Sequence, residues 1–266
     1  MISSPSGGGN VDMGYDDETD LLKAEVPCGT VLEQQMPPWQ LDQRHSTRGA
    51  LTYQRRTRQD PDVPLFDRWC ARPPLAEGTP TWRYLSEERG LPPRILALVA
   101  WHGLIREGHG GSAWFAHQDQ AGRLTGVEMR GPHWRGFSAD SDKSLFQLPG
   151  GDGAMPRLVV VAAAIDALSL ASLEGPRGDT LYLATAGDCG PMTIAALRAL
   201  LAQRAGLAQL VAASAADDAG EHYAICLAEL AQEAGVTCER LRPPRALGDW
   251  NAILVAAAGR DHRHAA

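Results

Sequence analysis

The chain has 266 residues, 44% of them hydrophobic, and a formal net charge of -7 at pH 7. This hydrophobic content is sufficient for one or two compact domains with a core of their own. The negative charge excludes a protein coated throughout with basic residues for nucleic-acid binding, although a local basic patch can still bind phosphate. No apolar run is long enough to span a membrane, and the first residues lack a signal-peptide pattern. We therefore expect a cytoplasmic protein with no membrane partner.

Two regions of unusual composition come first in the chain. Residues 1–20 are rich in Gly, Ser and Asp and contain no Lys or Arg, so they are predicted to form a disordered acidic tail. Residues 21–78 contain several prolines and arginines and end in a Pro-rich linker. The cysteines of the chain form no C-x-x-C pair, and we therefore expect no zinc site.

Residues 79–150 are predicted to form a small α+β unit. Two helices separated by Pro92 and Pro93 are followed by two strands, Ala113–Gln118 and Leu124–Met129, which are joined by a glycine-containing turn. Residues 138–155, after the second strand, are rich in turn residues, and no strand is predicted there.

Residues 151–258 show the clearest pattern, in which four apolar strands alternate with three helices. Strands without polar alternation indicate a mainly parallel sheet with helices on both faces, which is an α/β fold. The last residues, 259–266, are a polar tail. In such sheets ligands bind beyond the carboxyl ends of the strands. The informative positions should therefore follow Val161, Thr185, Ser214 and Pro243.

The loop after the third strand of this unit contains two adjacent carboxylates, Asp217 and Asp218, before Gly220. Carboxylates at a strand end can hold Mg²⁺, which takes one or two protein carboxylates and fills its shell with water or phosphate. Alternatively, one of them caps the helix that follows. Taken alone, this stretch favours the cap.

Three segments in order, VVVAAAIDALSLASL, ASAADDAGEHYA and RPPRALGDWN, resemble the Toprim domain of bacterial primases and of related proteins on plasmids and other mobile elements. The resemblance implies a Toprim-like sheet. In that family a Glu ends the first strand, and its position here is Ala162, four residues before Asp166. The third strand of the family ends in Asp-x-Asp, which corresponds to Ala215 and Asp217. Asp249, in GDWN, resembles the Asp of the closing Asp-Trp-Asn.

The resemblance implies that the family Glu acts in proton transfer and that the Asp pair holds Mg²⁺ or Mn²⁺. The catalytic positions would be Ala162, Ala215 and Asp217, and an alanine methyl can do neither task. The remaining candidate metal ligands are Asp217, Asp218, Asp166 and Asp249, which would bind a cation weakly or not at all. Natural loss of the acidic centre and deliberate substitution both explain the two alanines.

The middle unit, with SAWFAHQDQAGRLTGVEMRG followed by Lys143, resembles the basic subdomain that precedes Toprim in primases. The resemblance implies that Arg130 and Lys143 face the template or a nucleotide, and Arg135 lies between them in the sequence. Arginine offers a planar fork for phosphate and lysine a point charge. The alternative is that these are ordinary solvated cations.

Aromatic residues lie close to these cations in the sequence. Trp134, in GPHWRG, is the candidate for an exposed side chain that stacks on bases, whereas Trp114 and Phe115 are expected in the core. Region 21–78 faintly resembles a primase zinc-binding module without its Cys and His ligands.

The leading hypothesis is a primase-like DNA-processing protein with an impaired, Mg²⁺-using Toprim centre. Its partners would be single-stranded or nicked DNA and nucleotides. Two alternatives remain open, a non-catalytic Toprim protein that binds nucleic acid or a protein partner, and a Toprim nuclease. Restoring the acidic side chains at positions 162 and 215 would separate them.

Overall fold

The computed structural model describes residues 63–139, 141–151, 153–175, 177–187, 189–203 and 206–264. These residues all belong to one compact unit. The predicted acidic tail and most of region 21–78 lie outside the described residues.

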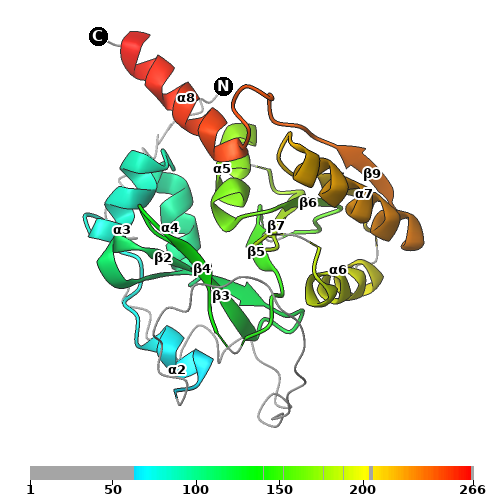
Figure 1. The fold of residues 1–266 in the computed structure, drawn as a ribbon, viewed down its shortest axis with the longest axis horizontal. Coiled ribbons are helices and arrows are strands. Elements are labelled where there is room, and N and C mark those ends of the chain that lie inside the picture. Colours follow the sequence, from blue (N-terminus) through cyan, green and yellow to red (C-terminus); the bar gives the residue numbers. More distant parts are fainter. Residues whose placement is uncertain are drawn as a thin grey trace, which may run out of the picture. The chain divides into compact units, whose positions relative to one another are not determined.

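The first part of this unit is a small antiparallel sheet with short helices (Figure 1). Its helical elements are α2 (Leu65–Cys70), α3 (Pro80–Arg83), the π-helical η1 (Tyr84–Glu88), α4 (Pro93–Trp101) and the 3-10 turn η2 (His109–Gly111). Its strands pair in the order β1 (Ile105–Glu107), β2 (Ala113–Gln118), β3 (Leu124–Arg130) and β4 (Arg135–Phe137). The two predicted strands are confirmed. β1 and β4 were missed because three residues are too few to show an alternating pattern.

The second part is a five-stranded sheet in the order β5-β7-β6-β8-β9. Its strands are β5 (Phe146–Pro149), β6 (Arg157–Val161), β7 (Thr180–Ala184), β8 (Gln209–Ala212) and β9 (Thr237–Arg240). Its helices are α5 (Ala164–Glu174), α6 (Pro191–Gln203), α7 (Asp218–Glu233) and α8 (Trp250–His264). All neighbours pair in parallel except β5, which is antiparallel to β7. The predicted α/β fold is confirmed, but the turn-rich segment contains an edge strand that the sequence reading left out.

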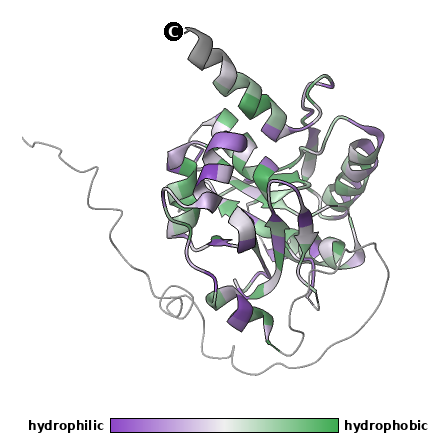
Figure 2. Cartoon of the chain, turned by 60° about the vertical axis from the view of Figure 1, so that its left-hand side comes forward, coloured by the Kyte–Doolittle hydropathy of each residue, from purple (hydrophilic) through white to green (hydrophobic). Residues whose placement is uncertain are grey.

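Alternate side chains of β6 explain why helices cover both faces of this sheet. Val159 and Val161 pack into a cluster that includes residues of α5 and α8, whereas Leu158 and Val160 pack against α6 and α7. The first cluster also contains Phe115 of β2, so the two sheets share part of one core. The covering helices carry hydrophilic and hydrophobic residues together (Figure 2).

Two further expectations concern burial and membranes. Trp114 and Phe115 are 5% and 0% exposed, which confirms that both belong to the core. Within the part of the chain that the structure describes, a helix with the length and apolar character needed to cross a membrane is not found.

Candidate functional site

The loops at the carboxyl ends of the parallel strands are joined by backbone hydrogen bonds. The N–H of Gly187, after β7, donates to the carbonyl of Ala162, after β6, at 2.9 Å. The N–H of Ala216, after β8, donates to the carbonyl of Gly248, before α8, at 3.3 Å. Two pairs of loops from distant parts of the sequence therefore lie at one edge of the sheet, where ligands of such sheets bind.

Ala162 follows the last residue of β6 and Ala215 lies three residues after the end of β8 at this edge, and both are partly exposed. The backbone at position 215 is tightly held. Arg240 donates to its carbonyl at 2.8 Å and to that of Ser214 at 3.0 Å. A side chain on Gly220 would collide with the same carbonyl of Ala215, so the first turn of α7 can lie against this loop only because residue 220 is glycine.

Asp217 is the N-cap of α7. Its Oδ1 accepts a hydrogen bond from the N–H of Gly220 at 2.7 Å. This is the cap that the sequence offered as one interpretation, and it satisfies one of the free amides at the head of the helix. Asp218 lies in the first turn of α7 and is exposed.

Asp166 and Asp249 come from the heads of α5 and α8 and approach each other. Asp166 Oδ1 accepts the N–H of Asn251 at 3.2 Å, and Asp249 Oδ1 accepts the N–H of Ala252 at 2.7 Å. Burial, and then the negative charge of Asp249, raise the pKa of Asp166 to about 7. A divalent cation would relieve this repulsion, so the pair fits a weak two-carboxylate site.

The four predicted metal ligands do not form one centre. Among the residues that the structure describes, no group of three or more His, Cys, Asp or Glu side chains could hold a metal ion. Neither Asp217 nor Asp218 therefore completes a three-carboxylate group with Asp166 and Asp249. The expected absence of zinc concerns mainly region 21–78, which lies largely outside the described residues.

Glu128 on β3 is a site residue that sequence reasoning missed. Its side chain is buried, and Oε2 accepts the N–H of Ala164 at the head of α5 at 3.1 Å. Oε1 accepts from Arg130 Nε at 2.6 Å. Burial acts to raise the pKa of Glu128, but its contacts with His117 and Arg130 outweigh burial, so the pKa lies below its usual value. Residues two apart share a strand face, so the Glu128–Arg130 pair was the signal available in the sequence.

His117 on β2 extends this buried network. Its Nδ1 lies 3.1 Å from the carbonyl of Ser144, and a carbonyl only accepts, so Nδ1 carries the proton. Nε2 lies 3.5 Å from Glu128 Oε2, and a proton there would complete an ion pair. The network thus connects the antiparallel sheet to the head of α5 and to the residue that follows Lys143.

The predicted cations Arg130 and Lys143 both reach the carboxyl edge. The charge of Arg130 acts on Asp166, where it opposes the rise in pKa. Lys143 Nζ donates to the carbonyl of Ala186, in the loop after β7, at 3.3 Å. Ala186 has a φ of 55°, a left-handed conformation that non-glycine residues rarely adopt.

Arg135 and Trp134 lie on the antiparallel sheet, next to Arg130. Arg135 pairs with Arg130 across β3 and β4 and is exposed. Trp134 is 36% exposed, so its indole is accessible to a ligand, as its predicted stacking role requires. Whether either residue contacts nucleic acid stays a prediction.

Comparison with protein families matches these two parts separately. Residues 159–254 match a family model described as Toprim-like. This segment is a Toprim-like domain. The resemblance stated from the sequence is thereby confirmed. Residues 83–153, ahead of the Toprim-like domain, match a family described as proteins of unknown function, DUF3991. Comparison with curated protein sequences gave no match.

Solved structures similar to the chain include three primases. The primase fragment of the bacteriophage T7 primase-helicase protein is 19% identical, with a TM-score of 0.38, over 60% of this chain and 64% of that one. The zinc-binding and RNA polymerase domains of the Aquifex aeolicus primase are 17% identical, with a TM-score of 0.46, over 70% and 55%. The RNA polymerase domain of Mycobacterium tuberculosis primase DnaG is 18% identical, with a TM-score of 0.43, over 66% and 74%. This chain covers less than two thirds of the first two.

Proposed function

We propose that this chain is a primase-like DNA-processing protein of the cytoplasm that binds the phosphates of single-stranded or nicked DNA, or of nucleotides, at the carboxyl edge of its Toprim-like domain. One observation supports this most directly. Lys143 donates to the carbonyl of Ala186 at this edge. Arg130 is paired with Glu128, whose other oxygen accepts the N–H of Ala164 at the head of α5. Asp166 and Asp249 lie at the heads of α5 and α8 beside these cations. Cations beside a weak acidic pair suit a phosphate whose charge is shared between protein and metal.

The acidic pair defines what a metal would do. Asp166 and Asp249 would hold Mg²⁺ or Mn²⁺, which supplies positive charge to a reacting phosphate. Ala162 and Ala215 provide neither a proton-transfer group nor a further ligand. In this form the site is therefore expected to bind nucleic acid but to carry out little or no chemistry.

Removing the charge of Lys143 tests phosphate binding. Lys143→Met keeps the apolar stem of the side chain and removes the ammonium group. We expect the variant to bind a short fluorescent single strand about tenfold more weakly, with a salt dependence of log affinity shallower by about one. Arg198→Ala is the matched control, because Arg198 forms an exposed ion pair with Glu233 on α6 and α7. Equal loss in both variants would contradict the proposal, and so would an unaltered protein that binds neither the strand nor a nucleotide.

Restoring the two acidic side chains separates an enzyme from a binding protein. In Ala162→Glu with Ala215→Asp, we expect Mg²⁺-dependent primer synthesis at least about 100-fold above the unaltered chain, the usual scale of acid–base catalysis. Asp249→Asn on this background should abolish the Mg²⁺-dependent synthesis, because it removes one of the two proposed metal ligands. Gel analysis of extended or shortened products would tell polymerisation from cleavage, which is the nuclease alternative.

The second candidate function is nucleic-acid binding without chemistry, and the alanines at 162 and 215 favour it. It would be established if the restored variant formed no product while strand binding still depended on Lys143.

A further inference from the structure

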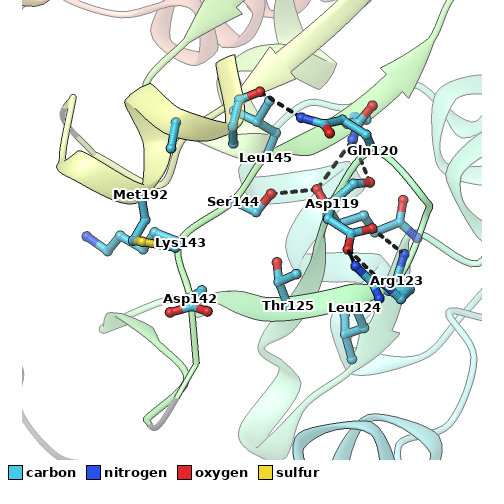
Figure 3. A pocket seen from close by; sticks show the side chains of 14 residues that line it. Asp119, Gln120, Arg123, Leu124, Thr125, Asp142, Lys143, Ser144, Leu145 and Met192 are labelled. Carbon is cyan, nitrogen blue, oxygen red and sulfur yellow. Dashed lines mark hydrogen bonds and ion pairs between the residues drawn. The ribbon is translucent and has the colours of Figure 1, made fainter. Parts of the chain in front are cut away.

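A pocket of about 640 Å³ lies beside the proposed phosphate site (Figure 3). Its walls are the turn between β2 and β3, the segment that leads into β5, and the start of α6. Its volume is typical of small-molecule sites. Nothing in the family matches or in the proposed function assigns a role to it.

One wall of the pocket is apolar and comes from a single helix. Met192, Ala195 and Ala196 lie at i, i+3 and i+4 of α6, and so on one face of the helix. The side chain of Met192 is 52% exposed, and its thioether is flexible and polarisable. The two alanines leave the wall shallow enough for a flat group to lie against it.

The opposite wall is polar and already ordered. Asp119 Oδ2 lies 2.6 Å from Arg123 Nη2, and Asp119 Oδ1 accepts the backbone N–H of Arg123 at 3.0 Å. Figure 3 shows this pair on one side of the pocket and Lys143 with Met192 on the other. Because Asp119 neutralises Arg123, this wall offers hydrogen bonds to a ligand without a large net charge.

Lys143 connects the pocket to the carboxyl edge of the parallel sheet. It lines the pocket, and its Nζ donates to the carbonyl of Ala186 beyond β7. A ligand in the pocket would therefore have a charged group within reach of Lys143 on the side that faces the proposed phosphate site. The pocket as a whole combines an apolar wall, a polar wall and one cation at its rim.

We propose that this pocket receives a nucleobase, whose flat face lies on the α6 wall, whose edge faces the Asp119–Arg123 turn, and whose phosphate contacts Lys143. The inference rests on the proposed function and names the part of the nucleic acid that is read. A base needs an apolar surface for its face and hydrogen-bond partners at its edge; the α6 wall supplies the first and the Asp119–Arg123 turn the second. The base comes from a strand or from a free nucleotide.

Photocrosslinking locates the base directly. A photoreactive thymidine analogue is placed within a short single strand, and in a parallel experiment the free analogue monophosphate is used with the full-length protein. We expect the labelled peptides to contain the β2–β3 turn or the first turns of α6. Labelling by the strand identifies a strand base, and labelling by the monophosphate identifies a free nucleotide. Labelled peptides that exclude both walls would overturn the proposal.

A pocket-filling variant gives an independent measurement. Ala195 is exposed on α6, so Ala195→Leu should fold normally while it occupies the α6 wall. Ala202→Leu is the matched control, because Ala202 is exposed two turns further along α6 and outside the pocket. The Ala202→Leu control should bind a strand that lacks the base at the bound position about tenfold more weakly than it binds the intact strand. Ala195→Leu should bind the two strands equally well.

The outcomes keep the two proposals apart. If the strand binds through Lys143, an abasic strand binds equally well and the monophosphate labels neither wall, only the base pocket is wrong. If neither a strand nor the monophosphate binds to the unaltered protein, the proposed function itself fails.

Discussion

Glu128→Ala is expected to destabilise the protein by about 3–5 kcal/mol, the scale for removing one partner of a buried charge network. The guanidinium of Arg130 and the N–H of Ala164 would lose their acceptor, and the imidazole of His117 would lose a neighbouring carboxylate. Ala164 and His117 are the buried partners, so water cannot replace the carboxylate without cost. Urea unfolding followed by circular dichroism measures the change.

Two further variants show whether charge or burial is responsible. Glu128→Gln keeps one carbonyl oxygen for the N–H of Ala164, but it removes the negative charge and the acceptor for Arg130. Its loss of stability should be smaller than that of Glu128→Ala, because one of the two acceptors remains. Glu233→Ala breaks the exposed ion pair with Arg198 and should change stability little, because solvent screens such pairs. A Glu128→Ala protein as stable as Glu233→Ala would show that the network contributes nothing.

Asp166→Asn is expected to stabilise the protein by roughly 2–4 kcal/mol near pH 8. The pKa of Asp166 is raised from 3.8 to about 7 in the folded protein. Between these values the folded state holds a proton that the unfolded chain has released, so stability falls as pH rises through this range. Asparagine carries no charge, and its side-chain oxygen can still accept the N–H of Asn251.

The pH dependence of urea unfolding tests this directly. The advantage of Asp166→Asn should vanish at about pH 3, where the carboxyl group of the unaltered protein is largely protonated in both states. Asp249→Asn should give a smaller gain near pH 8, because it removes the neighbouring charge and leaves Asp166 buried. If Asp166→Asn raised the free energy of unfolding not at all at pH 8, or equally at both pH values, the ionisation of buried Asp166 would not be the cause.

Added Mg²⁺ connects this pair to the proposed function. If Asp166 and Asp249 hold the cation, Mg²⁺ should stabilise the unaltered protein near pH 8 but not Asp166→Asn, because ligand binding to the folded state raises stability by mass action.

Local sequence patterns predicted much of the fold. The apolar runs of β6, β7 and β8 and the cap at Asp217 are signals within a few residues, and the structure agrees with them. β5 was missed because its four residues end at Pro149 and precede Gly150 and Gly151, which have the composition of a turn.

Contacts between distant segments were beyond the sequence. The Glu128–Ala164 bond spans 36 residues and the Asp166–Asn251 bond spans 85. Nothing near Glu128 shows that its carboxylate reaches a helix of the other sheet. The resemblance brought Asp166 and Asp249 into one list of ligands, but only the folded chain shows that these two approach each other.

The contacts around Ala215 carry one more consequence. Arg240 donates a hydrogen bond to its carbonyl oxygen, and Gly220 packs closely against the same oxygen. Neither contact involves the side chain at position 215. The path of the chain here is thus indifferent to whether residue 215 is acidic or apolar. Such a framework can gain or lose a carboxylate by one substitution and remain folded either way.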